Sequence, residues 1–415
     1  MIVSEKNSLD FNKVVAFVWA LTPFMQHYVV PGIGSNLAFS SLIMIGCLYL
    51  FLAKDRVVIQ QGDDRGSLVT KTVIIMFFYC TLHMLFFPPA LVYRGYVDSF
   101  PVVVIQFAFL LLCVAVFNNT EVRNHYFDYI EIIAIVMTIV VAFQVLVYMG
   151  TGITFSEDRS FLFPFKSYFE YDVKQTLLNS HMVIDGLFRP SAFFIEPAHY
   201  SQFCLIGLVA SLARSEQLLN KKAIIITVGI ILTTSGIGIV SSLMLWALKM
   251  IITEKGITNK VIIRCLMGLL LLMCLVVVLF LVSSSFKMAV IRIVVASNGH
   301  HSAIGGRLSS IALLGDLSTT ELLFGMGYHN IPTYGIAEIQ YYMTGIVQLL
   351  YCQGIIGTSI FGICYIWMMI KAFRKKSMLP LYALILYIPF LIGTANLGIL
   401  SLVQYFPLLY YERKG

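Results

Sequence analysis

Hydrophobic residues occupy long uninterrupted runs along the chain, and polar residues gather in the segments between the runs. Many of the runs are about 20 residues long, which is enough for a helix to cross the roughly 30 Å hydrocarbon core of a bilayer. Only helices and closed barrels satisfy their backbone hydrogen bonds in lipid, and these runs lack the alternation of barrel strands. The pattern therefore predicts an all-α polytopic membrane protein.

The runs predict about twelve transmembrane helices, each long enough or nearly long enough to span. The first span is not a cleavable signal, because no small-residue cleavage site follows it and the pattern continues into further spans. The two spans joined by TTSGIG are short, so a pair of short or broken helices is an alternative there. The predicted spans are residues 13–31, 36–53, 72–92, 101–117, 128–149, 197–213, 222–234, 236–252, 261–283, 342–370, 379–394 and 397–411.

Two connections between the predicted spans are long, residues 150–196 and residues 284–341. Loops of this length in a compact domain more often carry function than serve only as connections. The two halves of the chain show no internal repeat, which weakens the interpretation as a secondary transporter, since many such folds are built from repeats. We expect residues 1–415 to form one transmembrane domain that carries both large loops on its outer side.

The distribution of lysine and arginine predicts the orientation in the membrane. With the N-terminus in the cytoplasm, 20 of the 28 basic residues fall on the cytoplasmic side and 8 on the outer side. An even number of spans then places both ends of the chain in the cytoplasm and both long loops outside.

Composition supports the membrane class and narrows the function. The chain is 59% hydrophobic and only 12% charged, with a mean hydropathy of +0.87, whereas soluble domains carry about 25% charged residues. The net charge of +7 follows from the membrane topology and from attraction to anionic lipid headgroups, so it does not require a nucleic-acid partner. All eight cysteines fall inside predicted spans, which gives no indication of a disulfide framework.

The stretch FRPSAFFIEPAHYSQF at residues 188–203 concentrates charged and polar residues where the first long loop meets a span. Pro197 fits the first position of the following helix, which makes Glu196 its N-cap. His199 and Gln202 are three residues apart and share one face of that helix, and Arg189 precedes Glu196 by seven residues. Three of these residues also have an ordinary interpretation. Glu196 could be a capping carboxylate, His199 a packed histidine, and Arg189 an arginine bound to lipid phosphate.

The second long loop holds a further set of candidate residues. GGRLSSIALLGDL predicts a helix with Arg307 in its first turn, beside backbone N–H groups that favour an anion. LFGMGYHN predicts a glycine-rich turn that a ligand can approach closely, with His329 at its end. The pair His300–His301 lacks the spacing and the external cysteines of a zinc site, so we predict no metal. A surface position is the alternative interpretation for each loop histidine.

These residue types indicate one kind of chemistry on the outer side of the membrane. Arginine matches phosphate with its planar fork of donors, and a carboxylate or a neutral imidazole can accept a proton from an attacking hydroxyl. The combination suits a pyrophosphate-linked substrate outside the cytoplasm, where nucleotide-activated donors are absent.

The stretch RPSAFFIEPAHYSQF resembles the R-x-x-G-x-F-x-E-P-type signature of bacterial O-antigen and capsular polysaccharide polymerases (the Wzy family) and the related O-antigen ligases. GGRLSSIALLGDLSTTELLFGMGYHN is similar to the second external element of that family, and YYMTGIVQLLYCQGIIGTSIFG is similar to the span that follows it, with its Gly-Ile-Ile-Gly step. Ser191 or Ala192 stands where the family commonly has glycine. The His-Asn pair that many relatives, including the ligases, carry before the Gly-Ile-Ile-Gly step is missing, which favours a polymerase over a ligase.

The resemblance implies a metal-independent glycosyltransferase of GT-C-like fold, without a cofactor, in the bacterial inner membrane and active on its periplasmic face. Its substrates would be undecaprenyl-pyrophosphate-linked glycans as donor and acceptor, and a chain-length regulator and a flippase would be partners. Arg189 and Arg307 would stabilise the departing pyrophosphate. Glu196 is the first choice of base, or it orients Arg189. The alternative bases are His199, His301 and His329. The candidate substrate-binding residues are Gly325, Gly327 and Asn330.

Other functions stay open at this point. An O-antigen ligase is the nearest alternative, and a transporter or flippase of lipid-linked oligosaccharides comes from a different functional class. A transporter predicts charged residues near the bilayer midplane, whereas the predicted spans are nearly free of charge. A receptor or assembly role is the last alternative.

Overall fold

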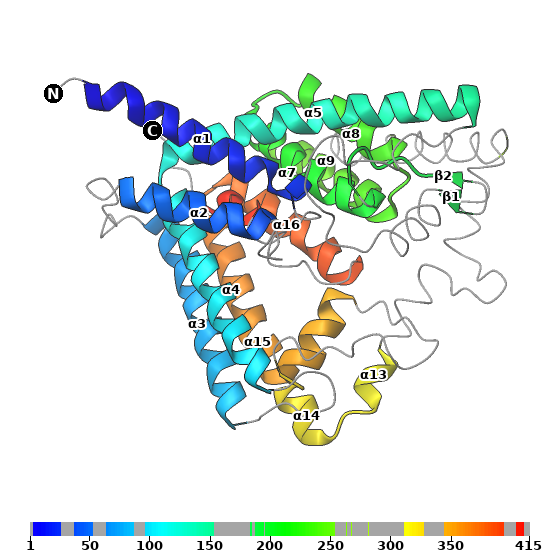
Figure 1. The fold of residues 1–415 in the computed structure, drawn as a ribbon. Helices are drawn as coiled ribbons and strands as arrows, with labels where there is room; N and C mark the ends of the chain where they lie inside the picture. The colour runs from blue at the N-terminus through cyan, green and yellow to red at the C-terminus, as the bar shows by residue number, and fades with distance from the viewer. Residues whose placement is uncertain are drawn as a thin grey trace. The chain divides into compact units, whose positions relative to one another are not determined.

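The computed structural model describes helices and their close connections across most of the chain (Figure 1). The described residues divide into two compact units, here called unit 1 and unit 2. Unit 1 comprises Met1–Leu42 and Asn124–Ser302, and unit 2 comprises Ile43–Arg123 and Ala303–Gly415. The described residues are 3–25, 37–52, 64–86, 96–152, 183–184, 187–194, 196–253, 263, 267, 281, 311–327, 344–393 and 404–410.

The described part of the chain is helical apart from two short strands, so the prediction of an α-helical membrane protein is confirmed. Four helical segments have the length and composition to cross a membrane, and four shorter apolar helices accompany them. The elements of unit 1 are α1 (Val3–Met25), most of α5 (Thr120–Thr151), β1 (Val183–Ile184), β2 (Leu187–Phe188), α7 (Pro197–Arg214), α8 (Lys221–Leu232) and α9 (Gly236–Thr253). Those of unit 2 are most of α2 (Leu37–Leu52), α3 (Asp64–Phe86), α4 (Tyr96–Phe117), α13 (Ala312–Gly315), α14 (Thr319–Phe324), α15 (Gly345–Arg374), α16 (Met378–Gly393) and the 3-10 helix η1 (Phe406–Leu409).

Ten of the predicted spans coincide with described helices, with ends displaced by up to ten residues. Of the span predicted at 397–411 only residues 404–410 are described, and they hold no helix longer than the 3-10 helix η1. The spans that TTSGIG joins are two separate helices, α8 of 12 residues and α9 of 18 residues. A 12-residue helix is about 18 Å long, which is shorter than the hydrocarbon core. The predicted span at 261–283 lies almost wholly outside the described residues, so the total of about twelve spans stays a prediction. The expectation of a single transmembrane domain also stays a prediction, and most of both long loops lies outside the described part.

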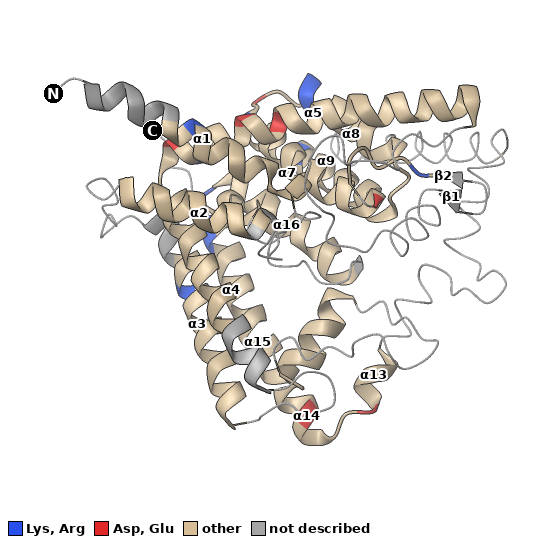
Figure 2. Cartoon of the chain, in the orientation of Figure 1, with Lys and Arg blue, Asp and Glu red and all other residues tan. Residues whose placement is uncertain are grey.

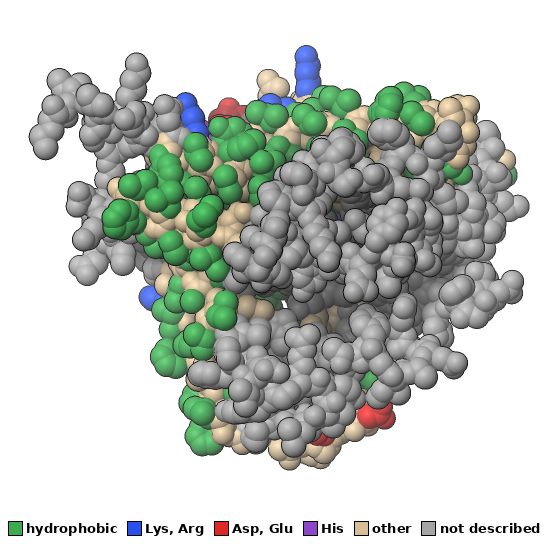
Figure 3. Space-filling model, in the orientation of Figure 1, with side chains coloured by type: hydrophobic (Ala, Val, Ile, Leu, Met, Phe, Trp, Pro, Cys, Tyr) green, Lys and Arg blue, Asp and Glu red, His purple; other side chains and the backbone are tan. Residues whose placement is uncertain are grey.

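Apolar side chains cover much of the visible surface over α2, α3 and α5, as expected for helices in contact with lipid (Figure 3). Phe51 and Met149 are examples, with 76% and 79% of their surface exposed. Charged residues are sparse along the described helices, and those of α5 all lie in its first twelve residues, TEVRNHYFDYIE (Figure 2).

Unit 1 is built around α7, whose side chains are mostly buried. α7 packs against α8 and α9, and Gly207 of α7 lets the helix approach Ala134 of α5, where an added Cβ would come within 2.9 Å of the alanine methyl. Small residues at such crossings allow the close backbone packing that membrane helices depend on.

Polar contacts tie the helices of unit 1 together at the end where α7 finishes. The buried Glu131 of α5 accepts from Lys222 at 2.7 Å and pairs with Arg214 at 3.4 Å. The buried Lys249 of α9 donates to the carbonyl oxygens of Leu212, at 3.0 Å, and of Ser215. An ammonium group at a helix C-terminus satisfies carbonyls that have no partner within the helix. These basic residues, counted above only as topology signals, therefore also hold the helix ends in place.

Unit 2 is a bundle in which α3 packs on α4 and α15, and α15 packs on α16 and α14 (Figure 1). Arg123 closes the end of α4 by donating to the carbonyl oxygens of Phe117 and Asn118. Its guanidinium group also lies 4.7 Å from the ring centroid of Tyr410, and the Tyr410 hydroxyl donates to the Val114 carbonyl at 2.6 Å. The last described residues of the chain are thereby attached to α4.

Candidate functional site

Residues 188–196, here called the arginine segment, connect β2 to the beginning of α7 in unit 1. The strands β1 and β2 pair antiparallel, with Ile184 opposite Leu187. The Phe188 ring stacks on Tyr148 of α5, with 4.4 Å between ring centroids and 21° between ring planes. The segment therefore starts from a position fixed on α5, immediately before Arg189.

A tight turn follows Arg189 and is held by side-chain hydrogen bonds. The Phe194 N–H donates to the Ser191 carbonyl at 2.9 Å, and the Ser191 hydroxyl donates to the Phe194 carbonyl at 2.7 Å. Gln144 of α5 bonds both backbone groups of Ala192: its amide nitrogen donates to the carbonyl at 3.1 Å, and its amide oxygen accepts from the N–H at 2.9 Å. All of these groups are buried away from water, so these hydrogen bonds satisfy the polar backbone groups of the turn.

Ala192 has a φ of 50°, in the left-handed region that L-residues with a Cβ adopt only at a cost. In the R-x-x-G signature that this stretch resembles, the glycine falls on Ala192. The turn geometry gives a physical reason for glycine at that position, and it shows that the small residue serves the backbone of the turn.

Phe194 anchors the turn in the core of unit 1. It is 1% exposed, and its ring lies 5.0 Å from that of Phe24, 5.4 Å from that of Phe203 and 6.0 Å from that of Tyr200, between ring centroids. Aromatic groups at these separations add to the stabilisation from buried area alone. The turn is consequently packed into the core on one side, while Arg189, Glu196 and His199 are half-buried.

Glu196 is the N-cap residue of α7 and Pro197 stands in the first turn, as predicted from the sequence. The Glu196 backbone is extended, with φ −132° and ψ 150°, and its carbonyl accepts the first helical bond from Tyr200 at 3.1 Å. Its side chain makes no capping hydrogen bond. The ordinary interpretation, a carboxylate that caps the helix, therefore does not account for Glu196.

Three of the predicted site residues, Arg189, Glu196 and His199, lie in unit 1, in a stretch of eleven residues that runs from the arginine segment into the first turn of α7. Gly325 and Gly327 belong to unit 2. Arg307, His301, His329 and Asn330 lie outside the described residues, so their predicted roles stay predictions.

The glycine-rich turn predicted from LFGMGYHN exists, with φ of 86° at Gly325 and 101° at Gly327. Its backbone binds α15: the Met326 N–H donates to the Tyr351 carbonyl at 2.8 Å, and the Gly327 N–H to the Cys352 carbonyl at 3.0 Å. Met326 itself packs in a small core with Val347, Tyr351 and Cys352. The close approach that these glycines permit is thus made to the protein's own helix.

α15 is broken at Gly354, where φ is 64° and ψ is −176°. The break leaves the carbonyls of Tyr351 and Cys352 without their usual helical donors. The turn at residues 325–327, here called the glycine turn, supplies the N–H groups that bond to them. A Cβ on Gly354 would collide with the carbonyl of Leu323, and one on Gly357 would collide with the Tyr79 ring. Both glycines of the Gly-Ile-Ile-Gly step, Gly354 and Gly357, are therefore required by packing.

Tyr79 of α3 completes this junction. Its hydroxyl donates to the Gln353 carbonyl at 2.6 Å and lies 3.4 Å from the Phe324 carbonyl. His83, one turn further along α3, is buried near the backbone of Phe324 and Gly325. α3 thus holds the break in α15 and the glycine turn together.

The approach to the glycine turn is α14, a short helix opened by a capping box. Ser318 accepts from the Glu321 N–H, and the Glu321 carboxylate accepts from the Ser318 N–H at 2.8 Å and from its hydroxyl at 2.7 Å. These bonds to Ser318 lower the pKa of Glu321. Before α14, the described part of the helix predicted from GGRLSSIALLGDL is α13, Ala312–Gly315.

Sequence reasoning missed Gln144, Tyr79 and His83. The available signal was a polar residue inside an otherwise apolar span, because such residues are rare in membranes and need partners. Charge alone does not detect these three residues, which are neutral or weakly basic.

In comparisons with known proteins, no family model matches the chain and no curated protein matches it.

Proposed function

We propose that the protein is a polysaccharide polymerase of the O-antigen or capsule type. It would transfer a growing glycan from undecaprenyl pyrophosphate to a repeat unit on the same lipid carrier, at the periplasmic face of the bacterial inner membrane. The observation that carries the proposal is the arginine segment, in which a buried, hydrogen-bonded turn lies between Arg189 and Glu196, and His199 follows in the first turn of α7. The GT-C-like arrangement of about twelve spans, with both termini in the cytoplasm, belongs to the same proposal.

The chemistry assigns a role to each residue. The acceptor hydroxyl oxygen attacks the anomeric carbon of the donor, and the bond from that carbon to the pyrophosphate oxygen breaks with its electron pair on the leaving group. Arg189 and Arg307 stabilise the negative charge that develops there. The hydroxyl proton passes to Glu196 as base, with His199, His301 and His329 as alternatives. Gly325 and Gly327 order the second outer element, and Asn330 follows it as a substrate-binding residue.

Two features support this assignment. Glu196 stands at the N-terminus of α7 and does not cap that helix with its side chain. Gly354 and Ala192 fall at positions with a left-handed φ, and Gly357 falls where the Tyr79 ring leaves no room for a side chain, so each signature position favours a small residue. A flippase that releases unpolymerised units and a chain-length regulator would be the partners of this reaction.

The test is complementation of a strain that lacks the gene. Arg189→Ala and Arg307→Ala should each reduce long glycan chains about 100-fold or more, because one donor to the leaving group is lost. Arg189→Lys, which keeps the charge but loses the fork, should retain part of the activity. Arg374→Ala, an exposed arginine at the end of α15, is the matched control and should behave as wild type.

The pattern of products separates the alternatives. A lost polymerase leaves a single repeat unit on the surface acceptor, whereas a lost ligase leaves none. Normal ladders in both Arg189→Ala and Arg307→Ala, with the proteins inserted in the membrane, would remove the assignment of these arginines.

A further inference from the structure

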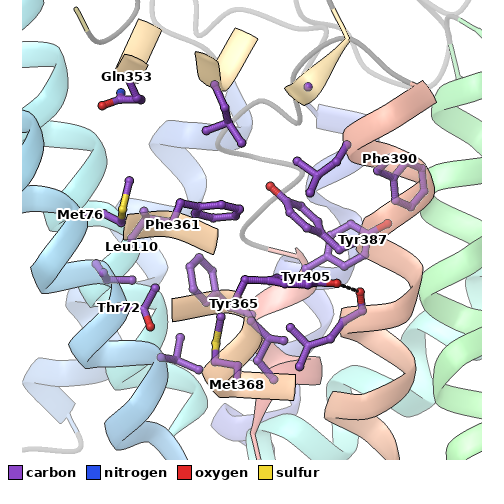
Figure 4. Close-up of a pocket in the computed structure, with 18 of the residues that line it drawn as sticks. Thr72, Met76, Leu110, Gln353, Phe361, Tyr365, Met368, Tyr387, Phe390 and Tyr405 are labelled. Atoms are coloured by element: carbon purple, nitrogen blue, oxygen red, sulfur yellow. Dashed lines mark hydrogen bonds between the residues drawn. The ribbon is translucent and has the colours of Figure 1, made fainter. Parts of the chain in front are cut away.

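Unit 2 contains a partly open cavity of about 250 Å³ (Figure 4). Its walls come from α3, α4, α15, α16 and the residues around η1. All four long helices are apolar segments of the kind that lie in a membrane. Protein interiors contain few voids larger than a water molecule, so a cavity of this size in a packed bundle requires an explanation.

The chemistry of the walls is apolar and uncharged. Met76, Leu110, Phe361 and Met368 are representative, and none of the described residues that line the cavity carries a charge. Methionine and aromatic side chains adapt to chains of irregular shape. The polar contribution comes from neutral groups, above all the amides of Gln348 and Gln353 on α15.

The cavity is elongated along the helices. On α3 its walls extend from Val69 to Cys80, which is about 17 Å along the axis. On α15 they extend from Gly345, near the beginning of the helix, to Met368. In Figure 4, Gln353 lies at one end, while Thr72 and Met368 lie at the other. The space therefore suits an extended chain better than a compact ring system.

We propose that this cavity binds one apolar chain of a membrane lipid, lying along α15 between Gln353 and Met368. A dry cavity of roughly 150 Å³ holds a six-carbon ring, so one of this size accommodates about ten carbons of a chain. At membrane depth the available apolar molecules are lipid chains. An empty cavity would deprive its walls of dispersion contacts that such a chain restores.

The uncharged walls define what the cavity excludes. A phosphate group placed among Gln348, Gln353 and the tyrosines of α15 and α16 would have no cation to balance it, and burying an unpaired charge is costly. The lipid phosphate therefore stays outside the lined space, and only the chain enters. The chain has two possible sources, the acyl chain of a bulk phospholipid and the isoprenoid chain of a lipid carrier. The inference holds for either source and does not depend on the proposed polymerase reaction.

Photolabelling of the full chain in nanodiscs tests the inference. One sample contains phosphatidylcholine with a diazirine in its acyl chain, and a second contains a polyprenyl phosphate with a diazirine in its chain. Adducts are expected on cavity residues such as Met76 and Met368. Labelling by the first probe alone identifies an acyl chain, and labelling by the second alone identifies an isoprenoid chain.

Filled-cavity variants supply the control. Ala383→Phe on α16 and Thr72→Phe on α3 occupy the space from two different helices and should reduce adducts inside the cavity about tenfold. Adducts on Phe78, which is 59% exposed on α3, should not change. If one variant fails to fold, the other carries the comparison. The inference is overturned if neither probe labels the cavity residues of the wild type, or if a folded filled variant is labelled there as strongly.

Discussion

The arginine segment of unit 1 and the glycine turn of unit 2 carry the two sequence signatures of a functional site, yet they are built differently. In the arginine segment, side chains of Gln144 and Ser191 hold a buried turn, and charged residues stand at its edges. In the glycine turn, backbone N–H groups bond directly to the carbonyls of the broken helix α15. The charged signature carries the chemistry of the proposed function, whereas the glycine signature marks close packing of backbone on backbone.

The break in α15 gives the strongest test of this difference. Gly354→Ala places a Cβ against the Leu323 carbonyl at a left-handed φ, so it should cost about 3 kcal/mol or more in stability. Thermal unfolding in detergent, together with the yield of inserted protein, measures the effect.

Gly362→Ala is the matched control, because it lies in the same helix with open space around its added methyl group. Alanine is the better helix former, so this variant should match or exceed wild type by up to about 1 kcal/mol. Equal stability of the two variants would show that α15 does not need its break.

Gln144→Leu tests the corresponding contact in unit 1. It leaves the N–H and the carbonyl of Ala192 buried without their partner, at a cost of about 2–4 kcal/mol. Hydrogen exchange at the Ala192 amide should accelerate, and long glycan chains should be lost because Arg189 and Glu196 are no longer fixed.

Gln217→Leu is the control, since Gln217 is exposed between α7 and α8 and should change stability by less than about 0.5 kcal/mol. Protection of the Ala192 amide that survives in Gln144→Leu would mean that Ser191 and the aromatic anchors alone hold the turn.

Ala192 sharpens the comparison, because this left-handed residue carries a Cβ. Ala192→Gly should stabilise the turn by up to about 1 kcal/mol, since glycine adopts a φ of 50° without steric cost. Ala192→Val should destabilise it more strongly, because a β-branched side chain meets both the unfavourable φ and a fully buried site. The difference in melting temperature between the two variants measures the strain. A valine variant as stable as the glycine variant would show that the left-handed φ at residue 192 is not strained.

Sequence patterns predicted the helices well because lipid imposes a minimum length of apolar chain on each of them. The sequence also placed Pro197 and Glu196 correctly at the beginning of α7, because helix capping depends on neighbouring residues. The partners of the arginine segment and the glycine turn could not be predicted, because Gln144 is 48 residues from Ala192 and Tyr79 is 274 residues from Gln353. The periodicity of a run does not indicate which polar group another segment will meet. The left-handed φ at Ala192 could not be predicted for a similar reason, because the contact with Gln144 that holds it is distant in the sequence.

The smallest expected effect concerns α14, which leads into the glycine turn. The pKa of Glu321 is lowered by its bonds to Ser318, so the folded state binds a proton less readily than the unfolded chain. The stabilisation is therefore fully present above the unfolded pKa of about 4.3 and is lost as the pH falls through the lower, folded pKa. It amounts to less than about 1 kcal/mol, because solvent screens the exposed carboxylate.

Amide exchange at Leu322 and Leu323 measures the local opening of α14 between pH 6 and pH 3, after correction for intrinsic rates. Protection should fall over this range in wild type and should be lower but independent of pH in Glu321→Gln, which cannot ionise. Protection in wild type that stays constant down to pH 3 would mean that the backbone bonds from the glycine turn to α15, and not the capping box, hold this element against the bundle.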